Sequence, residues 1–135
     1  MQTEKEMEFQ QVVQDAGERF VESAREMLAK LRAADEDEDL IDAAQREIYE
    51  YPLSVLTRSG WRYPGSEPKA DEEFEILLGT GGPASRIVGD LDEGGQPVVA
   101  RYEYQDWFKP WTEARLSDEQ RDVLLDFASQ FYFGG

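Results

Sequence analysis

The stretch "ILLGTGGPASR" (residues 76–86) is either a phosphate-binding loop that leads from a strand into a helix or a hairpin turn between two paired strands, and the two interpretations imply different folds. It contains Gly79, Gly81 and Gly82 after an apolar run, and glycine-rich turns after strands often surround a phosphate with backbone N–H groups. A Walker-type phosphate loop requires a Lys followed by Ser or Thr, and a dinucleotide-binding loop precedes a helix. This stretch has no Lys, and "SRIVGDL" (85–91), which overlaps its end, has the pattern of a strand. We therefore predict a hairpin turn between two paired strands.

Short segments of strand character surround this turn. They are, in chain order, residues 53–61, 73–80, 85–91 and 97–107. Phe74, Ile76 and Leu78 alternate along the second segment, as in a half-buried strand, and "DEGGQ" (92–96) has the composition of a hairpin turn. Because the strands are short and joined by turns, we predict an antiparallel sheet of three or four strands within residues 53–107.

Helical periodicity occupies the first 50 residues. Thr3 and Glu6 form a capping-box pattern at the start of a long helix, 3–34, and a second helix, 37–49, ends before Pro52. Apolar residues recur along the first helix at steps of three and four: Phe9, Val12, Val13, Ala16, Phe20, Ala24, Met27, Leu28 and Leu31. This spacing of about 3.6 residues favours packing on the protein's own core over a long coiled coil.

A third helix is expected at the C-terminus, over residues 117–132. Ser117 and Gln120 form another capping-box pattern, and Gly134 is a helix-stop signal. The predicted class is therefore α+β, with a helical hairpin, an antiparallel sheet and a C-terminal helix. We expect one domain over 1–135, with an acidic helical part at 1–50 and helices on one face of the sheet.

Net charge is the outstanding property of the composition. Thirty acidic residues face 14 basic ones, and the formal net charge is −16. Such a field repels nucleic acid, nucleotides and anionic membranes, and it attracts basic surfaces. Solubility or adaptation to salt would explain the same composition. The sequence has no apolar run long enough to span a membrane and begins with a polar, acidic segment, so we expect a cytoplasmic protein.

The chain contains no histidine and no cysteine. Thiol nucleophiles, imidazole bases and the usual zinc sites are therefore excluded. In the acidic run beginning at Asp35, the sixth and twelfth positions of a calcium loop are Leu40 and Arg46 instead of Gly and Glu, and in the run beginning at Asp90 the twelfth position is Arg101. We therefore expect no metal and no cofactor. Asp106 and Glu113, beside aromatic residues, leave a carboxylate hydrolase as a remote alternative to a non-enzymatic protein.

Acidic residues gather in the segment 35–50, where Arg46 is the one basic residue. The candidate partner-binding acids are Asp35, Glu36, Asp37, Glu38, Asp39, Asp42, Glu47 and Glu50, with Glu18, Glu22 and Glu26 on the first helix. One helical row places acids roughly 6 Å apart, whereas a duplex strand carries a phosphate every ~3.4 Å. A DNA-like surface therefore needs both rows. We expect Asp15–Arg19 and Glu26–Lys30 pairs to neutralise the first helix in part, and a simple solvated turn remains an alternative.

Three tryptophans require an explanation. Core or edge packing is the simplest interpretation for Trp61, Trp107 and Trp111. If some of them are exposed, a protein-binding surface is favoured over a sugar site. Tyr51, Trp107 and Trp111 are the aromatic residues that we consider as anchors for a partner.

Three blocks resemble a family of small, largely uncharacterised acidic proteins of phages, plasmids and other mobile elements. The blocks are "FEILLGTGGPASRIVGDLDEGGQP" (74–97), "YQDWFKPWTE" (104–113) and "LLDFASQFYFG" (124–134), within a similar region of about 53–134. The resemblance implies no catalytic chemistry. In charge and size the chain is also similar to antirestriction and anti-CRISPR inhibitors that imitate DNA.

These observations lead to two functional hypotheses. The first is a non-enzymatic inhibitor, monomeric or homodimeric, that binds a basic nucleic-acid-binding protein or complex of host defence and blocks DNA access. It would bind neither nucleic acid nor membranes directly. The alternative is an adaptor or structural module of a mobile element that binds protein through an aromatic patch.

Overall fold

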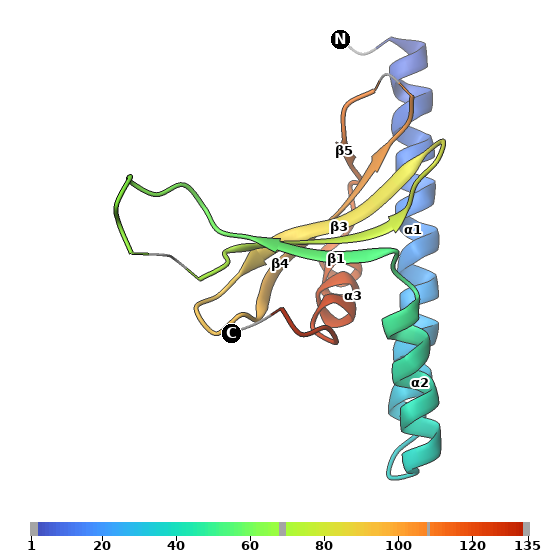
Figure 1. Ribbon diagram of the computed structural model, residues 1–135. Coiled ribbons are helices and arrows are strands. Elements are labelled where there is room, and N and C mark those ends of the chain that lie inside the picture. Colours follow the sequence, from blue (N-terminus) through green and yellow to red (C-terminus); the bar gives the residue numbers. More distant parts are fainter. Residues whose placement is uncertain (1–2, 68–69, 108, 134–135) are drawn as a thin grey trace.

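A helical hairpin, an antiparallel sheet and a third helix follow one another along the chain (Figure 1). The computed structural model describes residues 3–67, 70–107 and 109–133. Its elements are α1 (Glu4–Ala33), α2 (Glu38–Glu50), β1 (Ser54–Arg58), β2 (Glu73–Gly79), β3 (Ala84–Leu91), β4 (Pro97–Gln105), β5 (Thr112–Glu113) and α3 (Asp118–Ala128). The predicted α+β class and element order are confirmed.

The sheet has five antiparallel strands in the order β1-β2-β3-β4-β5, which is more than the three or four that we predicted. The strand missed by the prediction is β5, which lies outside 53–107 and pairs Thr112 with Tyr104 and Glu113 with Glu103. Two residues are too few to produce a period-two pattern, so β5 arises from tertiary pairing and not from a local signal.

The glycine-rich stretch is a hairpin turn, as predicted. It connects β2 to β3 in antiparallel register, and Gly81 takes a φ of 96°, which favours glycine. The pairing register shifts between Leu77 and Gly79, so the strand is irregular just before the turn. The stretch therefore continues into a strand and not into a helix.

The turn "DEGGQ" is held by one side chain. The Asp92 carboxylate accepts hydrogen bonds from the N–H groups of Gly94 and Gln96, both at 2.9 Å. Gly95 adopts a φ of 79°. The prediction of a hairpin between β3 and β4 is confirmed, and the acid is a local structural element of the turn.

Both predicted capping boxes are present, at Thr3–Glu6 and at Ser117–Gln120. The C-terminal helix, however, ends at Ala128 and not at residue 132. Phe131 and Phe133 continue the apolar pattern, but the chain turns after the helix and Phe133 packs on Phe74, with ring centroids 4.9 Å apart. The predicted stop at Gly134 lies outside the described residues. No helix in the described ranges has the length and apolar content that crossing a bilayer requires.

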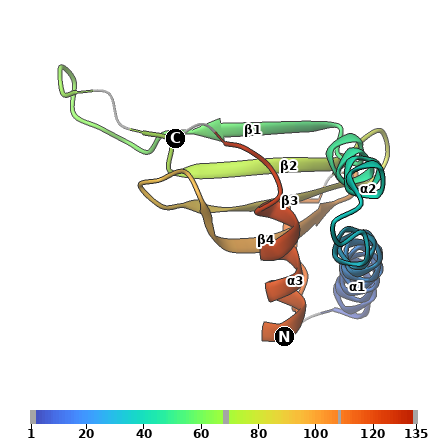
Figure 2. The ribbon, with the colours of Figure 1, turned by 90° about the horizontal axis from the view of Figure 1, so that it is seen from below.

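Helices α1 and α3 pack against one face of the sheet, whereas α2 packs mainly along α1 (Figure 2). Phe74, Ile76, Ile87 and Tyr102 alternate with polar residues along their strands and are buried on this inner face. The principal helical residues that pack against them are Val13, Phe20, Val21, Ala24, Leu124 and Phe127. The opposite, outer face carries charged residues, so the sheet is amphipathic in the way that the alternation predicts.

Phe127 lies at the centre of this core. It is fully buried and contacts Phe20 edge-on, with ring centroids 5.2 Å apart. We expect Phe127→Ala to lower the free energy of unfolding by about 3–5 kcal/mol, because it leaves a cavity between α1 and α3. Tyr132→Ala, at a residue 85% exposed, should change it by less than about 0.5 kcal/mol. Urea denaturation measures both, and equal effects would contradict this assignment of the core.

Candidate functional site

The acidic segment forms the end of a helical hairpin that projects away from the sheet (Figure 1). Helix α2 runs back along the C-terminal half of α1, and Lys30 of α1 pairs with Glu47 of α2 at 3.2 Å. At the base of the hairpin, the ring of Tyr51 packs on Phe20, with centroids 5.7 Å apart. The hairpin is therefore joined to the core at one end and exposed at the other.

All of the candidate acids between residues 35 and 50 are exposed. They are Asp35, Glu36, Asp37, Glu38, Asp39, Asp42, Glu47 and Glu50. Glu47 pairs with Lys30, whereas the acids from Asp35 to Asp42 form no ion pair among the described residues. The turn and the first part of α2 thus carry the concentration of uncompensated negative charge that the sequence predicted.

Two of these acids also shape the turn. Asp35 adopts a φ of 50°, a left-handed conformation that Asp tolerates better than most residues. The Asp37 carboxylate accepts hydrogen bonds from the N–H groups of Asp39 at 3.1 Å and Leu40 at 3.2 Å, and so caps α2. Asp37 therefore has a structural role in addition to its charge.

The second acidic row, Glu18, Glu22 and Glu26, is exposed on α1 as expected. The predicted neutralising pairs within this helix are wrong. The structure instead pairs Lys30 with Glu47 of α2, and Asp15 accepts a hydrogen bond from Gln11 at 2.8 Å. The first outcome follows from the tertiary packing of α2, which brings Glu47 within reach of the lysine, whereas the second is a local contact between residues four apart on α1.

Arg25 lies between the middle of the acidic row on α1 and the first turn of α3. It pairs with Glu22 at 3.1 Å and forms two hydrogen bonds to Glu119 in the first turn of α3. The hydrogen bond from Arg25 lowers the pKa of Glu119, and its electrostatic attraction acts in the same direction. The same contacts raise the pKa of Arg25. The Arg25 guanidinium therefore links α1 to α3.

The structure does not bring the acids and the two candidate tryptophans of the C-terminal half together. The loop that contains Trp107 lies between β4 and β5, beside the N-terminal part of α1, because Lys109 lies over the ring of Phe9 at 5.5 Å. The acidic turn is at the other end of α1 (Figure 1). At 1.5 Å per residue, Phe9 and Ala34 are roughly 37 Å apart along the helix. One small contact surface cannot contain both groups.

The anchors that we predicted are engaged within the chain. Trp111 is half-buried, and the Arg86 guanidinium lies 4.1 Å from its ring centroid. Tyr51 is 42% exposed, and its ring packs against Phe20 and Phe127 at the edge of the core. Trp107 is exposed but lies in the distant loop. None of them adjoins the acidic turn.

The aromatic residues of the loop between β1 and β2 are highly exposed and are not among the predicted anchors. Trp61 and Tyr63 are 100% and 85% exposed on the long loop between β1 and β2, although Trp61 also makes a contact within the chain. The expectation of core or edge packing is wrong for Trp61, because β1 ends at Arg58 and not at residue 61. The Pro- and Gly-rich composition of "GWRYPGS" (60–66) was the available signal.

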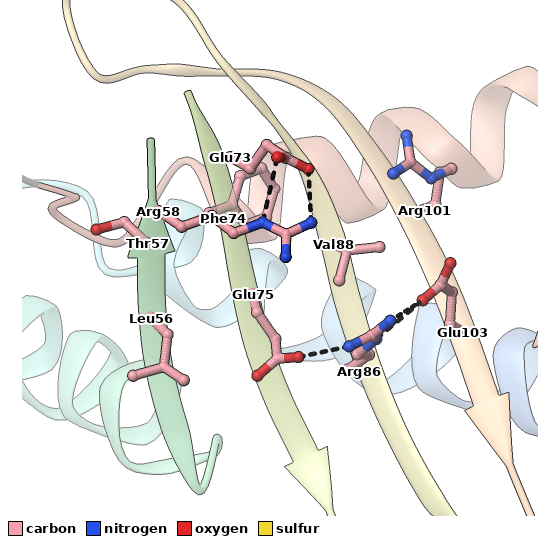
Figure 3. Close-up of a pocket in the computed structure, with 10 residues that line it drawn as sticks. All are labelled: Leu56, Thr57, Arg58, Glu73, Phe74, Glu75, Arg86, Val88, Arg101 and Glu103. Carbon is pink, nitrogen blue, oxygen red and sulfur yellow. Dashed lines mark hydrogen bonds and ion pairs between the residues drawn. The ribbon is translucent and has the colours of Figure 1, made fainter. Parts of the chain in front are cut away.

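The outer face of the sheet holds a hollow of about 460 Å³. In Figure 3, Arg86 lies between Glu75 and Glu103, at 2.6 and 2.7 Å. The other two arginines that line it, Arg58 and Arg101, are 3.2 Å from Glu73 and 3.7 Å from Glu113, respectively. Each of these arginines thus has an internal carboxylate partner, and the network is a cross-strand stabilising feature of the sheet. The alternation of charged residues along the strands could have predicted this cross-strand network of arginines and carboxylates.

The two carboxylates considered for catalysis, Asp106 and Glu113, have other contacts. Asp106 accepts a hydrogen bond from the N–H of Trp107 at 2.7 Å, and Glu113 pairs with Arg101. In the ranges that the structure describes, no group of three or more His, Cys, Asp or Glu side chains is arranged to hold a metal ion.

No family model matches the chain, and neither a curated protein nor a solved structure is significantly similar to it. The resemblance of residues 53–134 to mobile-element proteins therefore stays a prediction. The candidate site depends on the geometry and charge of the hairpin.

The capping role of Asp37 can be separated from its charge. We expect Asp37→Ala to lower the free energy of unfolding by about 1 kcal/mol, because two N–H groups of α2 lose their acceptor. Asp37→Asn removes the same charge but keeps a capping oxygen, so its stability should stay close to that of the wild type. Thermal unfolding of both variants measures the difference, and equal losses would exclude a capping role.

Proposed function

We propose that this protein is a non-enzymatic inhibitor that binds a basic, nucleic-acid-binding surface of a host defence complex and blocks access of DNA. The acidic helical hairpin is the binding element. The observation that carries the proposal is the exposure of the acids from Asp35 to Asp42, none of which is paired with a cation among the described residues. The antirestriction or anti-CRISPR class is what the resemblance implies.

The arrangement of the charges supports a competition with phosphates. The row Glu18, Glu22 and Glu26 follows α1 at roughly 6 Å per turn. The turn adds a second, denser group of acids at the end of the same hairpin. Together they compensate for the low charge density of one helix relative to a duplex strand, which carries a phosphate every ~3.4 Å.

The proposed mechanism is electrostatic. Carboxylates of the hairpin occupy Lys and Arg side chains that otherwise hold phosphates, and the net charge of −16 accelerates the encounter. Because most of these acids are exposed, salt should weaken the complex strongly. The loop with Trp107 lies at the other end of α1, so it is not part of this binding element.

The alternative is an adaptor that binds protein through aromatic residues. The exposure of Trp61 and Tyr63 favours it, because Trp, Tyr and Arg are the residues that dominate binding energy at protein interfaces and Arg62 lies between the two rings in sequence. Such an interface would be mainly apolar and would persist at high salt.

Charge reversal in the hairpin tests the inhibitor directly. We expect the triple variant Glu36→Lys, Glu38→Lys and Asp39→Lys, which keeps the capping residue Asp37, to lose the partner that the wild type captures from host lysate at about 0.1 M salt. A wash at about 0.5 M salt should release the partner from the wild type. The captured complex should bind labelled duplex DNA after release and not before.

A matched control distinguishes the effect of where the acids lie from the effect of the total charge. Reversal of Glu8, Glu67 and Glu93 to Lys changes the net charge by the same amount, from −16 to −10, at scattered exposed positions. This control should keep capturing the partner. If both triple variants bind as the wild type does, or if both fail equally, the hairpin is not the binding element.

The adaptor alternative predicts a different pattern. A Trp61→Ala, Tyr63→Ala variant would then lose its partner even in a high-salt wash, because buried aromatic anchors typically contribute about 2 kcal/mol or more each. Tyr132→Ala is the control, since Tyr132 is as exposed as Tyr63 but lies after α3. Retention of the partner by the double variant would exclude an adaptor that uses this loop.

A further inference from the structure

Strand β1 (Ser54–Arg58) is one of the two edge strands of the sheet, and the two-residue strand β5 is the other (Figure 2). It pairs with β2 on one side, and no strand of the described chain pairs with its other side. Backbone N–H and C=O groups along such an edge are a template for another strand. Natural edges are usually blunted by proline, lysine or a bulge, and "SVLTR" has none of these.

Strand β1 lies in a segment that differs from the rest of this acidic chain because it contains no acidic residue. Residues 51–66 contain no Asp or Glu and two arginines, although 30 of the 135 residues are acidic. Leu53 is exposed, and so is Leu56, at 58%. The edge thus combines unpaired backbone and exposed apolar side chains with no acidic residue of its own, and the nearby carboxylates of Asp71 and Glu73 are bound to Thr57 and Arg58 of the same strand.

We propose that two copies of this protein associate through β1, which pairs antiparallel with the β1 of a second copy. The two sheets then form one continuous ten-stranded sheet about a two-fold axis. A second copy fits this edge because two chains of net charge −16 repel each other at most orientations, and the acid-free segment is where they can approach closely.

The sequence of β1 suits pairing with itself. When the axis passes through Leu56, this leucine lies opposite the partner's Leu56, and exposed leucines at such positions come within about 5 Å of each other. Arg58 then lies opposite the partner's Ser54, so that no like charges face each other. A strand of five residues is close to the average length for a sheet.

The flanking segments are complementary in charge. Beyond Arg58, the chain of one copy runs past the start of β1 in the second copy, toward the C-terminal end of its α2. Arg62 lies in the segment that follows Arg58 in one copy, and Glu50 is the last residue of α2 in the other copy. An arginine that approaches the negative end of a helix and its final carboxylate is stabilised by both.

Sedimentation of the purified protein, with no other ligand, tests the proposal. We expect a reversible monomer–dimer equilibrium between about 1 µM and about 1 mM, and a dimer that persists at about 0.5 M salt, where the mutual repulsion is screened. We expect Leu56→Lys to raise the dimer Kd by about tenfold or more, because like charges then face each other across the two-fold axis. Within one copy the new lysine lies opposite Glu75, so the fold should tolerate it.

Leu40→Lys is the matched control, because Leu40 is 54% exposed and lies on α2 in the acidic hairpin. This variant and the hairpin charge reversals should dimerise as the wild type does, so a failure of the dimer is distinguishable from a failure of the proposed inhibition. Amide hydrogen exchange of wild-type residues 54–58 should slow as concentration rises. A wild type that stays monomeric throughout, or a Leu56→Lys variant that dimerises unchanged, would overturn the proposal.

Discussion

The contact among Phe20, Tyr102 and Phe127 is the one on which the remaining structure depends. Phe20 stacks on Tyr102 with ring centroids 6.0 Å apart and meets Phe127 edge-on, so one cluster joins α1, β4 and α3. Desolvation by this packing raises the pKa of Tyr102. The cluster holds α1 across the inner face of the sheet, and α1 in turn determines where the acidic hairpin projects. Because α1 is one long helix that is held near its middle, the same cluster also determines where both ends of α1 lie.

This placement separates chemically different surfaces. The uncompensated acids lie at one end of α1, the loop of Trp107 lies at the other, and the arginines of the outer sheet face are neutralised in place by Glu75, Glu103 and their neighbours. The acid-free edge at β1 is a further surface. A strongly acidic protein can therefore have both a region that attracts basic partners and a region where two copies can meet, because its charge is unevenly distributed.

Sequence patterns predicted the elements whose causes are local. The Thr3 and Ser117 caps, the turn at Gly81 and the alternation of Phe74 and Ile76 depend on neighbours within a few residues. The errors have long-range causes. Strand β5 forms because it pairs with β4, and α3 ends early because Phe133 packs on Phe74. Lys30 pairs with Glu47 of α2 and not with Glu26 of its own helix, because α2 packs beside α1. The exposure of Trp61, by contrast, has a local cause, because β1 ends at Arg58, before the Pro- and Gly-rich stretch at 60–66.

By itself, the sequence determined the α+β class, the order of elements and the concentration of acids at 35–50, because periodicity, capping and charge are properties of short segments. Tertiary structure alone decided which acids are neutralised, where the aromatic residues lie relative to the acidic turn, and which two strands form the edges of the sheet. Those outcomes depend on contacts between segments far apart in the chain. The packing of α1 against β4 and α3 determines such contacts, and no local pattern encodes them.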